Sequence, residues 1–151
     1  MDADYDKHIK ISKGLVVKKE EILSNSIIPK EIIRSVKETP YYLLIFIIRE
    51  EIIKINLFPI DTNNIKKILI NLVEFSPELV NAISENLKQL QLKDHILFTT
   101  GICYSEEACY YESYLNLKNI ENGEKILNEI ENAFKNLPKV LKVIIEDIAT
   151  I

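Results

Sequence analysis

Residues 71–83 read Asn-Leu-Val-Glu-Phe-Ser-Pro-Glu-Leu-Val-Asn-Ala-Ile and join a predicted strand to a predicted helix. Ser76 suits the N-cap position, because a serine hydroxyl accepts a hydrogen bond from the first helical turn. Pro77 suits the first helical position, where no backbone N–H is needed. The helix predicted over 77–92 carries its apolar side chains on one stripe: Leu79, Val80, Ile83, Leu87 and Leu90. The stretch therefore predicts a strand that leads directly into an amphipathic helix.

The segments around this junction alternate regularly. Strands are predicted over 65–75, 95–103, 109–117 and 140–148, and a second helix over 124–137. The order is βαββαβ. Short connections and right-handed crossovers predict a four-stranded antiparallel sheet with both helices on one face, a ferredoxin-like sandwich.

The chain before residue 61 has a different pattern. Short β-branched stretches occur at 15–19 and 26–28, followed by a short helix over 29–37 and two strands, 41–48 and 52–58, joined by a tight turn. The polar break Pro59–Asn64 predicts a domain boundary. We therefore predict an α+β protein in three parts: an N-terminal tail (1–12), a small β-rich module (13–61) and a βαββαβ domain (65–151).

Bulk composition limits the class of protein. Of the 151 residues, 47% are hydrophobic and 28% are charged, which is enough to form a core, and the net charge is -4. The N-terminus is acidic, and the longest apolar run, Tyr41–Ile48, is too short to cross a membrane, which takes about 20 residues. We expect a cytoplasmic protein that is not associated with membranes. Abundant Ile, Lys, Asn and Glu suit an AT-rich genome, such as that of an archaeal or thermophilic organism.

Residues 65–150 resemble an ACT domain in element order and in the strand-to-helix junction quoted above. The resemblance implies a small-molecule effector, such as an amino acid, bound at Glu74, Phe75 and Ser76, and sheets that pair side by side between subunits. The helix start also offers free amide donors for a carboxylate. The alternative is that Ser76 serves as a helix cap alone. Ligand-binding members often carry a glycine in this turn, where this chain has Ser76-Pro77-Glu78.

Residues 13–59 resemble the SpoVT/AbrB-like module, a swapped-hairpin DNA-binding domain. The resemblance rests on Ser26-Ile27-Ile28-Pro29-Lys30-Glu31-Ile32, a following short helix, and a hairpin of strands 43–48 and 52–57. It implies an intertwined dimer on DNA. The family's usual Gly-Arg before the first of these strands is Ser24-Asn25 here, and its usual Gly-Asp before the hairpin is Tyr41-Tyr42.

A local basic excess supports the DNA hypothesis. Between residues 7 and 37 the basic residues are Lys7, Lys10, Lys13, Lys18, Lys19, Lys30, Arg34 and Lys37, against Glu20, Glu21 and Glu31. Clustered cations neutralise phosphates, although a solvated surface explains the same pattern. We predict contacts to DNA from Lys13, Lys18, Lys19, Asn25, Lys30 and Arg34, with Asn25 as the reader of a base edge.

The two cysteines, Cys103 and Cys109, flank a tight turn. They form either a cross-strand disulfide or two reduced thiols, and the rarity of cytosolic disulfides favours thiols. The sequence contains no motif for metal binding, phosphate binding or catalysis. We therefore expect no metal, no cofactor and no enzymatic activity.

Two functions fit these observations. The first is a DNA-binding transcriptional regulator whose ACT-like domain senses a small molecule. The second is a regulatory or scaffolding subunit that binds a metabolite or an enzyme partner and does not bind DNA. Either way we expect a homodimer or higher oligomer, because an isolated hairpin cannot bury Leu44, Phe46 and Ile48.

Overall fold

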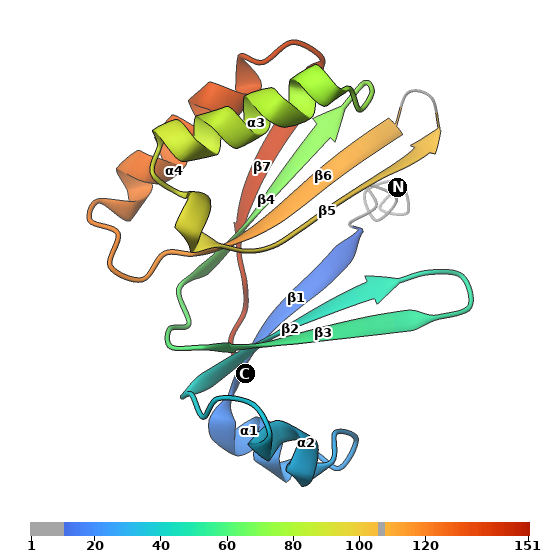
Figure 1. Ribbon diagram of the computed structural model, residues 1–151, viewed down its shortest axis with the longest axis vertical. Coiled ribbons are helices and arrows are strands. Elements are labelled where there is room, and N and C mark those ends of the chain that lie inside the picture. The colour runs from blue at the N-terminus through green and yellow to red at the C-terminus, as the bar shows by residue number, and fades with distance from the viewer. Residues whose placement is uncertain (1–10, 106–107) are drawn as a thin grey trace, which may run out of the picture.

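The computed structural model describes residues 11–105 and 108–151. This part of the chain forms two antiparallel sheets and four α-helices, which confirms the predicted α+β class (Figure 1). Most of the predicted tail, 1–12, lies outside the described residues. Ile11 and Ser12, which are described, are both buried.

The first sheet has three strands in the order β1-β2-β3. Its elements are β1 (Ser12–Lys18), α1 (Lys19–Ser24), α2 (Lys30–Arg34), β2 (Tyr41–Ile48) and β3 (Ile53–Ile60). Strand β2 has the predicted bounds. Its side chains alternate, so that Leu43 and Ile45 face the second sheet while Tyr42 and Leu44 pack beneath the two short helices.

The second sheet has four strands in the order β5-β6-β4-β7, and each neighbouring pair is antiparallel. Its elements are β4 (Ile65–Leu72), α3 (Pro77–Gln89), the 3₁₀ helix η2 (Lys93–His95), β5 (Ile96–Ser105), β6 (Ala108–Asn116), α4 (Gly123–Lys135) and β7 (Val140–Asp147). Helices α3 and α4 cover one face (Figure 1). Of the predicted apolar stripe of α3, Leu79, Ile83 and Leu87 are buried there and Leu90 is partly buried. Val80, which was also predicted to lie on the stripe, is 43% exposed.

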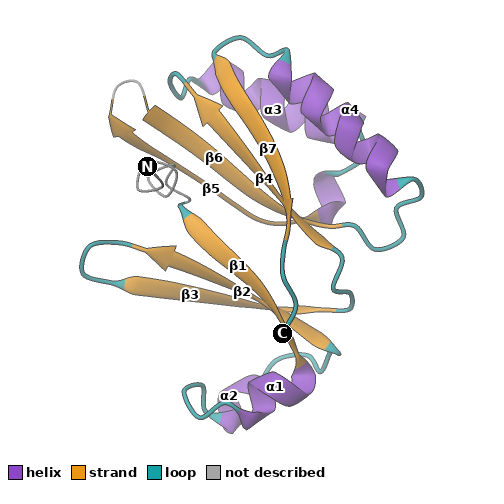
Figure 2. Ribbon diagram, turned by 180° about the vertical axis from the view of Figure 1, so that it is seen from behind, coloured by secondary structure: helices purple, strands orange, loops and turns teal. Residues whose placement is uncertain are grey.

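The first sheet covers the other face of the second. Val16, Leu43 and Ile45 share one apolar cluster with Leu69 and Tyr114 of β4 and β6. The layers are therefore helices, sheet, sheet, helices. Figure 2 shows the chain after β7 running down to β1, where it adds a short parallel bridge between residues 16 and 150. The two predicted modules thus share a core as well as the loop that follows β3.

Several local predictions were wrong. Residues 19–24 form helix α1, which the sequence analysis did not predict, and 26–28 form a bend in place of a strand. The helix forms because Glu20 and Glu21 occupy its first turn and Ile22 is buried against the sheet. Strand β4 ends at residue 72 in place of 75, since the next residues lead into the cap of α3.

The hairpin of β2 and β3 finds much of its packing within its own chain. Leu44 is buried in the cluster beneath α1 and α2, and Phe46 packs partly against it. The expectation that a second chain is needed to bury Leu44 is therefore wrong. Ile48, by contrast, is 60% exposed at the end of β2.

Candidate functional site

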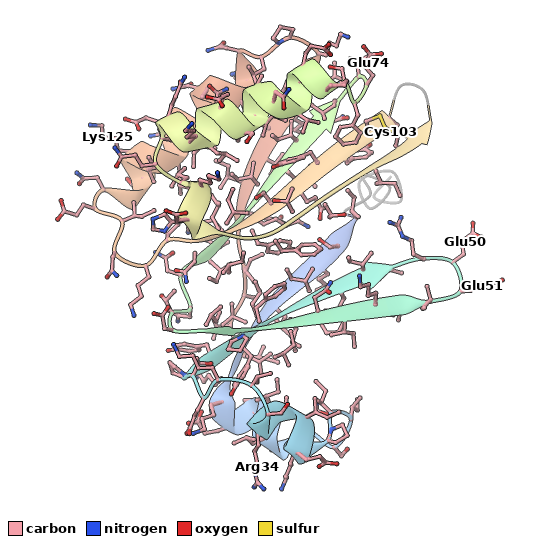
Figure 3. All side chains as sticks on the ribbon, viewed as in Figure 1. Arg34, Glu50, Glu51, Glu74, Cys103 and Lys125 are labelled. Carbon is pink, nitrogen blue, oxygen red and sulfur yellow. A yellow bond between two sulfur atoms is a disulfide. The ribbon has the colours of Figure 1, made fainter. Side chains whose placement is uncertain are left out.

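The residues predicted to contact DNA lie on three elements of the first sheet and its helices. Lys13 and Lys18 are exposed on β1, and Lys30 and Arg34 are exposed one turn apart on α2. Figure 3 shows Arg34 at the far end of the molecule from α3 and α4. Asn25 ends α1, and its Oδ1 accepts a hydrogen bond from the Ile27 N–H at 2.7 Å. The Asn25 side chain is therefore engaged in a local turn.

Lys19 differs from the other predicted DNA contacts because it has an acidic partner. Its ammonium group donates to the Glu38 carboxylate. This hydrogen bond raises the pKa of Lys19 and lowers the pKa of Glu38. The opposite charges of Lys19 and Glu38 largely cancel, so Lys19 adds little net positive potential to this surface.

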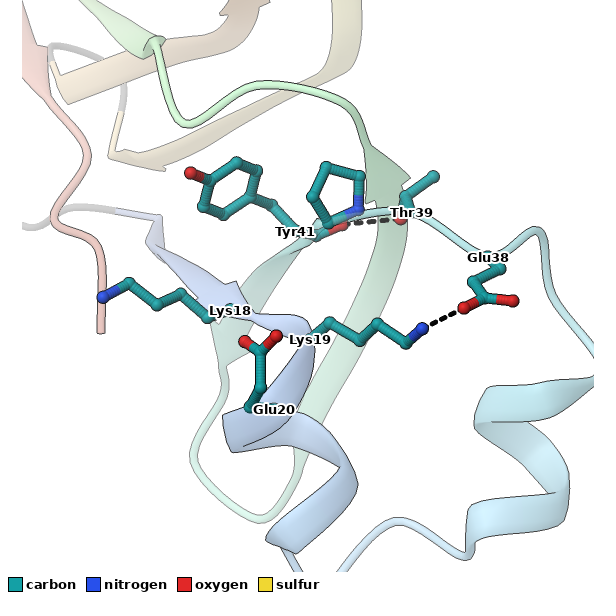
Figure 4. A pocket seen from close by; sticks show the side chains of 7 residues that line it. Lys18, Lys19, Glu20, Glu38, Thr39 and Tyr41 are labelled. Carbon is teal, nitrogen blue, oxygen red and sulfur yellow. Dashed lines mark hydrogen bonds and ion pairs between the residues drawn. The ribbon is translucent and has the colours of Figure 1, made fainter.

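A cavity of about 500 Å³ opens beside this ion pair (Figure 4). Its lining combines two lysines, two glutamates and three less polar residues: Lys18, Lys19, Glu20, Glu38, Thr39, Pro40 and Tyr41. The positive and negative side chains balance in number. The cavity therefore has no strong preference for an anion such as a phosphate.

The predicted effector residues all have structural partners. Ser76 caps α3, since its Oγ accepts a hydrogen bond from the Leu79 N–H at 3.2 Å. Glu74 forms an ion pair with Lys139. The Phe75 ring lies so close to Gly101 on β5 that a Cβ there would be 2.7 Å from the ring. The cap role predicted for Ser76 is confirmed, while effector binding at the three residues stays a prediction.

Cys103 and Cys109 form a disulfide across the β5–β6 hairpin. The two residues are paired directly in the sheet, as expected from their spacing. Cys103 is exposed and Cys109 is buried. Of the two states that the sequence left open, the structure therefore has the disulfide and not the favoured pair of thiols.

A buried ionic cluster between the two sheets was missed by the sequence analysis. Lys67 on β4 and Glu112 on β6 are 1% and 0% exposed, and the Lys67 Nζ lies 3.1 Å from Glu112 Oε2. Glu112 also accepts hydrogen bonds from the backbone N–H groups of Ile11 and Ser12, at 2.7 and 3.1 Å. Lys67 donates to the Ser12 carbonyl at 2.6 Å. The strand pattern carried no signal for this cluster, because Lys66 and Asn71 on β4 and Ser113 on β6 are polar as well.

This cluster joins β1 to the second sheet. The Tyr114 hydroxyl lies 2.8 Å from Ser12 Oγ, and burial raises the Tyr114 pKa well above its usual value. Gly14 passes directly over the Tyr114 ring, where a Cβ would be 2.5 Å from the nearest ring carbon. The groups of the cluster bond to one another and to the backbone, and the Lys67 Nζ also lies 3.9 Å from Oε1 of Glu146 on β7. Polar groups satisfied in this way are typical of a structural network.

The outer face of the β2–β3 hairpin carries exposed isoleucines. Ile48, Ile53 and Ile55, which we call the hairpin strip, are 60%, 61% and 46% exposed. Ile48 and Ile53 are directly paired across the two strands. The neighbouring turn adds Ile52, and Glu50 and Glu51 extend outward from its tip (Figure 3). The hairpin strip is a contiguous apolar surface that the described residues do not cover.

Comparison with known proteins found no protein-family model and no curated protein that matches this chain. Among the described residues, no group of His, Cys, Asp or Glu side chains is placed to hold a metal ion. In the same part of the chain, none of the helices has the length and apolar character needed to cross a membrane.

Proposed function

We propose that this protein is a non-enzymatic regulatory or scaffolding subunit that acts by binding another protein chain. The observation that carries this proposal is the hairpin strip. Large β-branched side chains exposed together on a sheet face are unfavourable in water, and contiguous apolar patches mark surfaces for protein partners. The cavity beside Lys19 does not gather charge of one sign, because its lining has two lysines and two glutamates.

Effector sensing by an ACT-like domain is the second part of the proposal. Its support is the strand order β5-β6-β4-β7 with α3 and α4 on one face, the arrangement of a ferredoxin-like sandwich. The capped start of α3 is the place where an effector carboxylate would be held. Calorimetry against a panel of amino acids tests this part. Binding that is weakened in Ser76→Ala supports it, and silence across the panel removes it.

DNA binding is the competing function, and exposed Lys30 and Arg34 favour it. These cations lie on the short helix α2, which stands at the end of the molecule away from α3 and α4 (Figure 1), where a duplex would have access. In the related swapped-hairpin arrangement, a second chain would supply the contacts that β2 and β3 make here within one chain. Against this function stand the Lys19–Glu38 ion pair and the acidic first turn of α1.

The experiment that separates the two functions is retention of mixed-sequence DNA on a filter over a series of salt concentrations. We expect weak retention that Lys30→Glu with Arg34→Glu leaves unchanged. The matched control is Lys125→Glu with Lys135→Glu, which makes the same charge change on distant α4. Tight retention that falls steeply with salt, and is lost in the α2 variant alone, would overturn the proposal in favour of DNA binding.

A further inference from the structure

Strand β3 is an open edge of the first sheet. In the order β1-β2-β3, the outer side of β1 is already paired with residues 149–151, through the bonds between the Val16 N–H and the Ala149 carbonyl and between the Ile151 N–H and the Val16 carbonyl. Within the described part of the chain, no strand pairs with the outer side of β3. An open strand edge presents unpaired N–H and C=O groups that favour pairing with another strand.

The hairpin turn determines which backbone groups of β3 point outward. The Arg49 N–H donates to the Ile52 carbonyl at 2.9 Å, so residues 49 and 52 face each other as a hydrogen-bonded pair within the hairpin. Hydrogen-bonded and non-hydrogen-bonded pairs alternate along an antiparallel ladder. The backbone N–H and C=O groups of residue 53, and of every second residue after it, therefore point away from β2. These are Ile53, Ile55 and Leu57, and then Pro59, which has no N–H to offer. The same residues direct their side chains to the outer face of the sheet.

We propose that β3 pairs with β3 of a second copy of this chain, antiparallel, about a two-fold axis at Ile55. In this register Ile55 lies opposite its own copy and Ile53 lies opposite Leu57, so all three outward amides are bonded. Lys54 then lies opposite Asn56. A register centred on Lys54 would place two lysines opposite each other, and one centred on Asn56 would place Ile53 opposite Pro59.

The occupant is a second copy because the edge is self-complementary. Apolar side chains lie opposite apolar side chains along the outer face, and no like charges are directly opposed. The partner's Ile53 would lie beside Leu57, which already packs against the cluster beneath α1 and α2. The two hairpin strips then lie side by side on one face of a six-stranded sheet, where Ile55 of each copy packs against Ile55 of the other. This inference rests on the proposed function and names the chain that the strip binds.

The experiment measures the molar mass of the full chain by sedimentation equilibrium over a range of protein concentrations. We expect a dimer whose Kd rises roughly tenfold or more in Ile55→Pro, because the two hydrogen bonds at the axis are lost. The substitution leaves the bonds between β2 and β3 intact, since the Ile55 N–H points outward. Ile55→Lys provides a second variant that keeps the amide and removes the apolar contact. The control is Leu141→Lys, which places the same charge on exposed β7, an edge of the second sheet.

Amide hydrogen exchange adds a readout specific to strand pairing. The amides of Ile53, Ile55 and Leu57 should exchange more slowly as protein concentration rises. A chain that stays monomeric would overturn the inference, while the proposed binding of a different protein would still stand. A dimer that Leu141→Lys dissociates and the Ile55 variants do not would also overturn it, in favour of pairing through β7. Both results are independent of the DNA-retention experiment. Failure of the proposed pairing through β3 can therefore be distinguished from failure of the proposed function.

Discussion

Glu112→Gln tests whether the buried ionic cluster joins the two sheets. The substitution keeps the size of the side chain and removes its charge, leaving the Lys67 ammonium group buried without its main counter-charge. At the observed 3.1 Å and an effective dielectric constant of about 20, Coulomb's law gives ~5 kcal/mol of attraction. The cost of burying Lys67 remains in the variant. We therefore expect a loss of about 3–5 kcal/mol in the free energy of unfolding, the range for removing one partner of a buried pair.

The assay is reversible denaturant unfolding followed by circular dichroism, with the thermal midpoint as a second measure. For a chain of this size, the loss corresponds to a midpoint lower by roughly 6–20 °C. The double variant Lys67→Met with Glu112→Gln should be less destabilised than the sum of the two single variants, because neither charge of the buried pair is then left without the other.

The matched control is Asp147→Asn, which breaks the ion pair with Lys66, the neighbour of Lys67 on β4. Asp147 is 79% exposed on its side chain, so the expected loss is below about 1 kcal/mol. The reasoning is refuted if Glu112→Gln costs no more than this control. Strictly additive losses in the Lys67 and Glu112 variants would refute it equally, because they would show that the two charges do not interact.

Three further predictions concern local features. Burial raises the Tyr114 pKa, so above pH 10 the unfolded chain releases a proton that the folded chain retains, and the free energy of unfolding should fall as pH rises past 10. Unfolding curves recorded at a series of pH values should show a shallower fall in Tyr114→Phe. Gly14→Ala places a Cβ against the Tyr114 ring and should cost about 1–3 kcal/mol by thermal unfolding, whereas Gly123→Ala, with open space around it, should cost nothing; equal effects would contradict the close contact at Gly14. Ser76→Ala removes the cap of α3 and should cost about 1 kcal/mol, with Ser76→Thr, which keeps the hydroxyl, close to the parent protein; an equal loss in both variants would show that the hydroxyl is not the cause.

Local patterns along the chain accounted for most of the elements. The bounds of β2 follow from eight consecutive apolar residues, and the start of α3 follows from Ser76 and Pro77, because caps and periodicity act within a few residues. The pairing of Cys103 with Cys109 followed from their positions on either side of a turn, but their oxidation state did not. The helix at 19–24 was missed because its stability comes from burial of Ile22 against a sheet that is distant in sequence.

The packing of one sheet on the other could not be predicted, because it depends on contacts between residues about 50 to 100 positions apart. Lys67 and Glu112 looked like ordinary polar positions in alternating strands until the fold placed them together between the sheets. Their burial is tolerable because each charge meets the other and the backbone of β1, a condition that no local pattern encodes. The exposure of the hairpin strip has the same origin. Tertiary contacts decide which face of an apolar hairpin is covered by its own chain and which face remains for a partner.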